Sequence, residues 1–283
     1  MKRQLYTAIT IVAAAALSLT SCVKDDLHNT PNPDKGSVIV APDWSDALAV
    51  ADIPPTYFIA VDGSEAKPAA GESAAFPELL TPGQHQLLVY NQPQGITINA
   101  TTARIDKLAD GTATPLPGYL FSATEPITVV ADAGQTIAVP MKRLVCPVAI
   151  ILTLDGDNVG AIADVKASLS GLAGSVDLQS GKVDGSVAIN LPVERTANLI
   201  TLRCRAFGSG SSDKQTLTVT VTMADGHTET VVNDLTSALK DIQAQMEPIE
   251  IKGLLTAPQD GHFIGTITDW TSGNGGGESG DAK

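Results

Sequence analysis

The stretch QTLTVTVTMADGHTETVV, residues 215–232, decides the fold class. Apolar side chains alternate with threonine from Leu217 to Met223, which is the period-two pattern of a half-buried antiparallel strand. Asp225-Gly226 then supplies a two-residue turn, because both residues accept a positive φ at low cost. A second strand follows over His227–Val232. The stretch therefore predicts a β-hairpin with one face buried.

Short β-branched runs separated by turn residues such as Asp62-Gly63 and Pro117-Gly118 continue this pattern along the chain. Strands at spacings of about ten residues predict an all-β protein built of antiparallel β-sandwiches rather than a parallel α/β sheet. The expected strands are Ser37–Ala41, Thr56–Val61, His85–Asn91, Ile96–Ile105, Ile127–Val139 with a break at 132–134, Arg143–Leu154, Val165–Leu169, Val187–Pro192, Leu199–Phe207, Gln215–Met223, His227–Val232, Ile249–Leu254 and Phe263–Trp270.

The helical content is expected to be small. One short helix is predicted over Asp234–Met246, where an Asp or Thr cap opens it and Pro248 follows its end. A brief helical turn is expected near Asn158–Ala163. The turn at 140–142 divides the strands into an N-terminal β-sandwich, residues 37–141 (the first half), and a C-terminal β-sandwich, residues 142–271 (the second half). Residues 272–283 are Gly-rich and acidic and predict a flexible tail.

Composition excludes several classes of function. The 283 residues carry a net charge of −13 without a basic cluster, so a nucleic-acid partner is not expected. Three cysteines are too few for a disulfide scaffold. The four histidines show no metal-ligand spacing, and neither a Ser/His/Asp set nor a carboxylate pair stands out. We therefore expect no cofactor, no metal site and no enzymatic activity.

The first residues have the features of an export signal. Lys2 and Arg3 precede an apolar run that is too short to span a bilayer comfortably, so residues 1–21 predict a signal peptide. The run ends in Leu-Thr-Ser-Cys22, which resembles the bacterial lipobox, and the thiol of Cys22 is the expected site of lipidation. An ordinary signal peptide with a chance cysteine is the alternative. Loss of the signal deepens the net charge from −13 to −15.

The residues after Cys22 form a polar segment with two prolines. Residues 22–36 therefore predict a lipidated tether. Lys24, Asp25 and Asp26 resemble the lipoprotein signal of Bacteroidota that directs export to the outer face of the outer membrane. The alternative interpretation is a solvated, charged linker. The protein is expected to be anchored in the outer membrane through its lipid and not to span it.

Several scaffold segments carry a family resemblance, namely 43–45, 82–83, 87–91, 117–121, 139–141, 169–171, 176–178, Gly181 and 266–270. They resemble the FimB-type fimbrial anchor and minor-subunit lipoproteins of Bacteroidota, within the fimbrillin superfamily. The resemblance implies two transthyretin-like β-sandwich domains and subunits that join by insertion of a strand, the β-strand addition mode. It also implies that stalk subunits lose their N-terminal strand by proteolysis, whereas an anchor keeps it. Residues 23–41 contain no Arg, so an Arg-specific protease would find no cleavage site near the first strand.

Few other residues suggest chemistry. Cys146 and Cys204 are expected to point inward, as a disulfide between two strands or as two buried free thiols. The segment from Asp155 to Gly160 begins like a calcium loop, but it lacks a suitable fifth ligand and has Lys166 at the twelfth position, so it predicts a turn. The histidines are expected to be solvated. Trp44 and Trp270 are expected to cap the cores, with exposed sugar-stacking platforms as the alternative.

The leading functional hypothesis is a surface lipoprotein that serves as the anchor or another minor subunit of a fimbria and binds fimbrial stalk or minor subunits. An adhesive tip subunit with a host ligand is a related possibility. The alternative from a different class is an outer-membrane glycan-binding lipoprotein of a polysaccharide-uptake system.

Overall fold

The computed structural model describes residues 34–156, 159–210, 214–240, 242–256 and 268–272. These residues form a nearly all-β protein, which confirms the predicted fold class. The strands of the first half are β1 (Ser37–Asp43), β2 (Thr56–Val61), β3 (Lys67–Ala70), β4 (Ala74–Ala75), β5 (Gly83–Tyr90), β6 (Ile96–Asn99), β7 (Thr102–Ile105), β8 (Phe121–Val129) and β9 (Gly134–Pro140).

The strands of the second half are β10 (Lys142–Arg143), β11 (Cys146–Asp155), β12 (Ile162–Leu172), β13 (Ser175–Asp177), β14 (Val183–Asp184), β15 (Val187–Leu191), β16 (Val193–Thr196), β17 (Leu199–Ala206), β18 (Thr216–Met223), β19 (Thr228–Asp234), β20 (Ile249–Thr256) and β21 (Thr268–Ser272). The helical segments are two 3-10 turns, η1 (Val50–Asp52) and η2 (Val159–Ala161), and the short helices α2 (Thr236–Leu239) and α3 (Ile242–Gln245).

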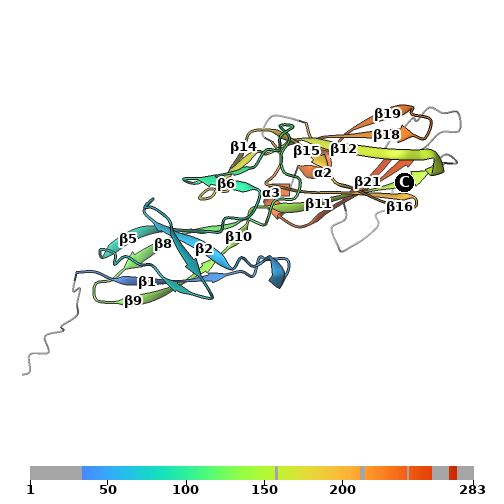
Figure 1. Cartoon of the computed structure of the whole chain (residues 1–283). Coiled ribbons are helices and arrows are strands. Elements are labelled where there is room, and N and C mark those ends of the chain that lie inside the picture. The colour runs from blue at the N-terminus through green and yellow to red at the C-terminus, as the bar shows by residue number, and fades with distance from the viewer. Residues whose placement is uncertain (1–33, 157–158, 211–213, 241, 257–267, 273–283) are drawn as a thin grey trace, which may run out of the picture.

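The strands pair into five sheets, two in each half and one across both (Figure 1). The first half contains β4-β1-β9 and β10-β8-β5-β2-β3, the latter taking in β10 from residues 142–143. The second half contains β16-β17-β11-β20-β21 and β15-β12-β18-β19. The fifth sheet, β14-β13-β7-β6, joins a hairpin of the first half to a hairpin of the second.

The expectation of purely antiparallel pairing was wrong at two places. β1 runs parallel to β9, and β20 runs parallel to β11. In each half, therefore, a strand from its beginning lies beside a strand from near its end. Hydrophobic alternation sets which face of a strand is buried but not the direction of its neighbour, so this pairing leaves no local sequence signal.

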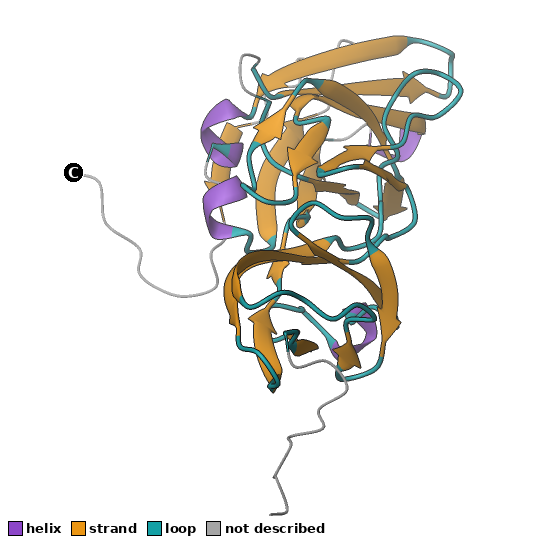
Figure 2. Ribbon diagram, turned by 90° about the vertical axis from the view of Figure 1, so that its left-hand side faces the viewer, coloured by secondary structure: helices purple, strands orange, loops and turns teal. Residues whose placement is uncertain are grey.

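Several element boundaries differ from the sequence prediction. The expected strand Ile96–Ile105 is a hairpin, because Ala100 adopts a positive φ of 53° and turns the chain between β6 and β7. The helix expected over Asp234–Met246 is found as α2 and α3, along one side of the second half (Figure 2). Strand β8 begins six residues before the expected Ile127, and β3, β4, β13, β14 and β16 were not predicted. Residues 263–267 of the last expected strand lie outside the described residues.

Two hydrophobic cores fill the molecule. The smaller core lies in the first half and includes Val38, Tyr57 and Phe121. The larger core lies mainly in the second half, but Leu88, Ile96 and other residues of the first half also belong to it. The β6–β7 hairpin thus packs onto the second half, and the predicted division at residue 141 stays a prediction.

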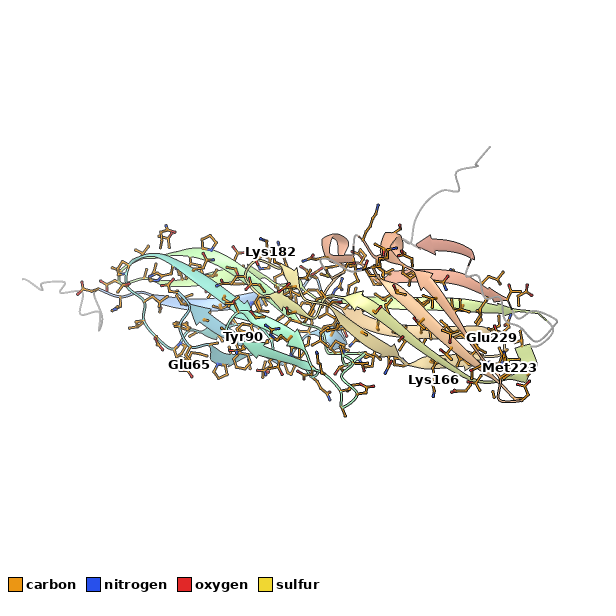
Figure 3. The ribbon with its side chains drawn as sticks, turned by 90° about the horizontal axis from the view of Figure 1, so that it is seen from above. Glu65, Tyr90, Lys166, Lys182, Met223 and Glu229 are labelled. Atoms are coloured by element: carbon orange, nitrogen blue, oxygen red, sulfur yellow. The ribbon has the colours of Figure 1, made fainter. Side chains whose placement is uncertain are left out.

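Side-chain contacts reinforce this junction between the halves. The Ser122 hydroxyl donates to the Leu178 carbonyl oxygen at 2.9 Å, and the Thr101 hydroxyl donates to Asp177 Oδ2 at 2.8 Å. The Arg205 guanidinium lies 4.0 Å from the centroid of the Tyr119 ring. The molecule is elongated along the line through both halves; Figure 3 places Glu65 and Tyr90 in the first half and Met223 toward the far end of the second.

Candidate functional site

The first strand and its surroundings form the candidate site in the first half. β1 lies between β4 and β9 and makes seven register pairs with β9, from Ser37 opposite Gly134 to Asp43 opposite Pro140. Val38 and Val40 are fully buried in the smaller core. The chain thus supplies from its own N-terminal region a strand that completes the first half.

Two loops form backbone hydrogen bonds with the residues just before β1. The Gly36 amide donates to the Leu80 carbonyl oxygen at 2.9 Å, and the Leu80 amide donates back to Gly36 at the same distance. The Asp132 amide donates to the Lys35 carbonyl oxygen at 2.9 Å. These bonds fix the backbone at the end of the molecule remote from the second half, where β1 begins (Figure 1). Sequence reasoning placed residues 22–36 in a tether and did not foresee that residues 35 and 36 belong to the fold.

A buried arginine secures the passage from the first half to the second. Arg143 is 3% exposed, and its backbone amide donates to Asp46 Oδ2 at 2.6 Å. Its guanidinium donates to the carbonyl oxygens of Asp46 and Met246. One residue therefore joins the loop after β1, the strand β10 and the segment after α3. A lone arginine has no distinguishing sequence pattern, so this role was not predicted.

The edge formed by β20 and β21 is the candidate site in the second half. β21 is the last strand of the five-stranded sheet and pairs antiparallel with β20. Among the described residues, Ile251, Lys252 and Leu254 of β20 have register partners in β21, with a shift between Lys252 and Leu254. On its other side β20 pairs with β11 along all eight of its residues. The last strand of the described residues thus lies at a sheet edge, where backbone groups can pair with a further strand.

Both cysteines of the folded part are buried free thiols. Cys146 lies opposite Ala206 and Cys204 opposite Val148, so the two are diagonal neighbours on β11 and β17. Diagonal Cα atoms are about 7–8 Å apart, beyond the usual disulfide range, so the register gives no support to a bridge. Burial raises the pKa of the Cys146 thiol to about 11 and that of the Cys204 thiol to about 12. Both are therefore neutral packing groups near pH 7.

The aromatic and calcium-loop candidates have structural roles where they are described. Trp44 packs edge-on against Tyr57 and Phe121, with ring centroids 6.1 Å and 5.5 Å apart, so it caps the smaller core as expected. The side chain of Trp270 and residues 157–158 of the calcium-like segment lie outside the part that the structure describes. Within the described part, no cluster of three or more His, Cys, Asp or Glu side chains suits a metal ion.

His85 is not simply solvated, which corrects the sequence prediction. Its Nδ1 lies 2.6 Å from Asp62 Oδ2 and its Nε2 lies 2.7 Å from the Thr81 carbonyl oxygen. The hydrogen bond to Asp62, followed by that to Thr81, raises the pKa of His85. His227 agrees better with the prediction, since it is partly exposed beside Glu229. His28 and His262 lie outside the described residues, as do Cys22, Lys24, Asp25 and Asp26.

Comparison with models of known protein families shows which family the chain matches. Residues 59–272 match the model of the fimbrillin-A associated anchor proteins Mfa1 and Mfa2. The chain belongs to this family. The membership confirms the resemblance to fimbrial anchor and minor-subunit proteins, and it supports a fimbrial accessory role. The family is structural rather than enzymatic. No curated protein matches the sequence.

Solved structures share the fold at low sequence identity. The fimbrial anchor protein Mfa2 from Porphyromonas gingivalis matches with a TM-score of 0.55 and 14% identity, over 82% of this chain and 100% of that one. A candidate adhesin from Bacteroides ovatus matches with a TM-score of 0.62 and 16% identity, over 86% and 96%. A protein from Bacteroides thetaiotaomicron described as a candidate polysaccharide-binding protein matches with a TM-score of 0.51 and 10% identity, over 81% and 94%.

Proposed function

We propose that this protein is a lipid-anchored fimbrial subunit of the outer membrane, with the role of anchor. The lipid is attached at Cys22, and Lys24, Asp25 and Asp26 direct the protein to the cell surface. Membership of the anchor family supports the role. Because β1 enters the fold at the end remote from the second half, a lipid on the preceding segment leaves the second half pointing away from the membrane.

The retained strand β1 is the observation that carries this proposal. A subunit that receives a strand from a neighbour needs an empty groove, since strand addition replaces missing backbone pairs and side-chain contacts. In the first half that groove is filled by the chain's own β1, with Val38 and Val40 buried. A subunit completed in this way needs no donor at its membrane end, as expected of an anchor.

The joint to the next subunit then falls to the second half. The edge of β20 is suited to it, because β21 is a short terminal strand that a neighbour's strand can extend or replace. The side chain of Lys252 is exposed on β20 and pairs with Glu250 at 2.9 Å. It therefore offers a position for a cross-link that does not disturb the core.

Cross-linking in assembled fimbriae tests the joint. We expect Lys252→Cys to cross-link to a neighbouring subunit, while Lys166→Cys, exposed on β12 of the other sheet, serves as the matched control. A third variant, Ile39→Cys, reports on β1, where residue 39 is 37% exposed. A cross-link at residue 39 and none at residue 252 would show that the joint uses the first half instead.

Loss of the gene separates an anchor from a tip subunit. Without an anchor, fimbriae are expected to change in length and to detach from the cells, which electron microscopy and the fimbrial content of the medium measure. A tip subunit would leave attachment intact and reduce adhesion to a host or glycan ligand. Unchanged fimbriae in a strain that makes them would contradict both roles.

A further inference from the structure

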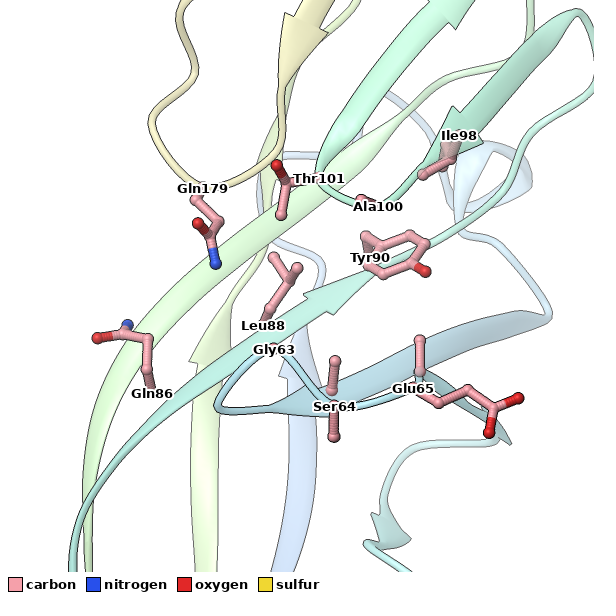
Figure 4. Close-up of a pocket in the computed structure, with 12 residues that line it drawn as sticks. Gly63, Ser64, Glu65, Gln86, Leu88, Tyr90, Ile98, Ala100, Thr101 and Gln179 are labelled. Carbon is pink, nitrogen blue, oxygen red and sulfur yellow. The ribbon is translucent and has the colours of Figure 1, made fainter.

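A cavity of about 270 Å³ lies at the junction of the two halves. Gln86, Leu88 and Tyr90 project from β5 toward it, the β2–β3 turn borders it on one side, and the β6–β7 turn and Gln179 border it on another (Figure 4). The lining therefore combines both halves of the chain. No motif of the sequence pointed to this place, because its residues are separated by up to about 120 positions in the chain.

The cavity exists because the β6–β7 hairpin covers only part of a sheet face. Beneath the β6–β7 hairpin, Ala60 and Leu88 are buried in the larger core. At the edge of this hairpin, Gln86 is exposed and Tyr90 is partly exposed. The Tyr90 ring stacks on Phe58 with centroids 5.5 Å apart and an interplanar angle of 18°, which holds it in one orientation. The aromatic wall is thus already in place without a ligand.

The polar groups at the rim are available for hydrogen bonds. The side-chain amides of Gln86 and Gln179 bond to no other described residue, and each offers two donors and an acceptor. Burial raises the pKa of the Tyr90 phenol, so it stays neutral. The carboxylate of Glu65 is held by Lys67 at 3.2 Å. The rim is therefore polar without a free cation among its lining residues.

This lining selects for one class of ligand. An anion would meet Glu65 and no lining Lys, Arg or His, and a metal ion would lack a cluster of ligands in the described residues. A purely apolar molecule would leave the two exposed amides bonded to water and would gain no hydrogen bond from them. Apolar walls with an aromatic ring and a few convergent hydrogen-bonding groups suit a small amphipathic ligand. The volume of about 270 Å³ lies just below the range of drug-sized sites, about 300–1,000 Å³, so the ligand has to be small.

We propose that the cavity binds one neutral sugar ring, with the apolar carbons of the ring against Leu88 and Tyr90 and its hydroxyls bonded to Gln86 and Gln179. This goes beyond the anchor role and does not depend on how the subunits join. It is also distinct from a glycan site at Trp44, which the sequence suggested as an alternative, since Trp44 does not line the cavity.

NMR titration of the full-length protein in detergent tests the site. The probes are the methyl glycosides of glucose, galactose, mannose and N-acetylglucosamine. We expect at least one to give saturable shifts of the Gln86 and Gln179 side-chain amides. Each of Gln86→Ala and Gln179→Ala is expected to weaken that binding about 3–10-fold, the value of one or two neutral hydrogen bonds.

The matched control is Gln92→Ala, an exposed glutamine that does not line the cavity, and it is expected to bind like the parent. Melting temperatures of all variants separate lost binding from lost folding. The proposal is overturned if none of the four glycosides gives saturable shifts at these amides, or if both cavity variants, folded, bind as well as the parent.

Discussion

Gly36 lies so close to Val130 that a Cβ atom at position 36 would be 2.4 Å from the Val130 carbonyl oxygen. The same atom would lie 2.6 Å from Val129 Cγ1. Position 36 therefore requires glycine for space, because real Cβ atoms do not approach backbone oxygens so closely. This close approach lets the loops at Leu80 and Asp132 hold the entry of β1.

Gly36→Ala is expected to destabilise the first half by about 1–3 kcal/mol, the usual cost of overpacking. Urea unfolding measures the free energy of unfolding. Gly160→Ala is the matched control, since a Cβ atom there meets nothing within 4 Å. If the two variants had the same free energy of unfolding, the loops around β1 would have to accommodate the added methyl group without loss of stability.

The pair of His85 and Asp62 predicts a pH-dependent contribution to stability. The pKa of His85 is raised in the folded state, so its contribution is complete below its unfolded value of about 6.5 and is lost as the pH rises through the folded value. The pKa of Asp62 is lowered, chiefly by the Gln86 amide and then by His85. Its contribution is present above its unfolded value of about 3.9 and is lost as the pH falls through the folded value.

We therefore expect an NMR titration of His85 to give a pKa above that of an unfolded histidine, and Asp62→Asn to return it toward that value. A pKa of His85 unchanged by Asp62→Asn would contradict the role of the hydrogen bond.

Arg143→Met is expected to destabilise the junction between the halves. The substitution removes the donors to the carbonyl oxygens of Asp46 and Met246, and each unsatisfied buried group costs about 1–3 kcal/mol. The control is Arg203→Met, because Arg203 forms an exposed pair with Glu194, and such pairs contribute about 0–1 kcal/mol. Denaturant unfolding followed by intrinsic fluorescence compares the two.

The cysteines are expected to be unreactive thiols in the folded protein. With pKa values of about 11 and about 12, Cys146 and Cys204 have little thiolate near pH 8 and are buried. A thiol reagent should label both only after unfolding, and the intact mass should show both thiol hydrogens. A mass lower by two hydrogens, in protein purified from the cell envelope, would establish the disulfide instead.

Cys22→Ser is expected to release the protein from the outer membrane, because a single thioether-linked lipid is the proposed anchor. Cell fractionation and metabolic labelling with a fatty acid measure this. Replacing Lys24, Asp25 and Asp26 with alanine should keep the lipid but remove surface exposure, as measured by protease accessibility on whole cells. A lipid-labelled Cys22→Ser protein would disprove the attachment site.

Local patterns predicted most of the long strands and few of the contacts between them. Alternation from Leu217 to Met223 and the Asp225-Gly226 turn gave the β18–β19 hairpin, which the structure confirms. The Ala100-Thr101 turn was missed because alanine rarely adopts a positive φ. The parallel pairing of β1 with β9 joins residues about a hundred positions apart. The cavity at Tyr90 and the role of Arg143 likewise arise only from tertiary packing.

The direction of β1 has a mechanical consequence for a subunit under load. β9 runs parallel to β1 and leads through residue 141 directly into β10 and the second half. A force between the N-terminal segment and the second half therefore pulls the two neighbouring strands in opposite directions along their shared axis. All seven register pairs resist this shear together, whereas a strand peeled from its end would lose its bonds one after another. The pairing of β1 with β9 is thus suited to resist extraction of the N-terminal strand from the first half.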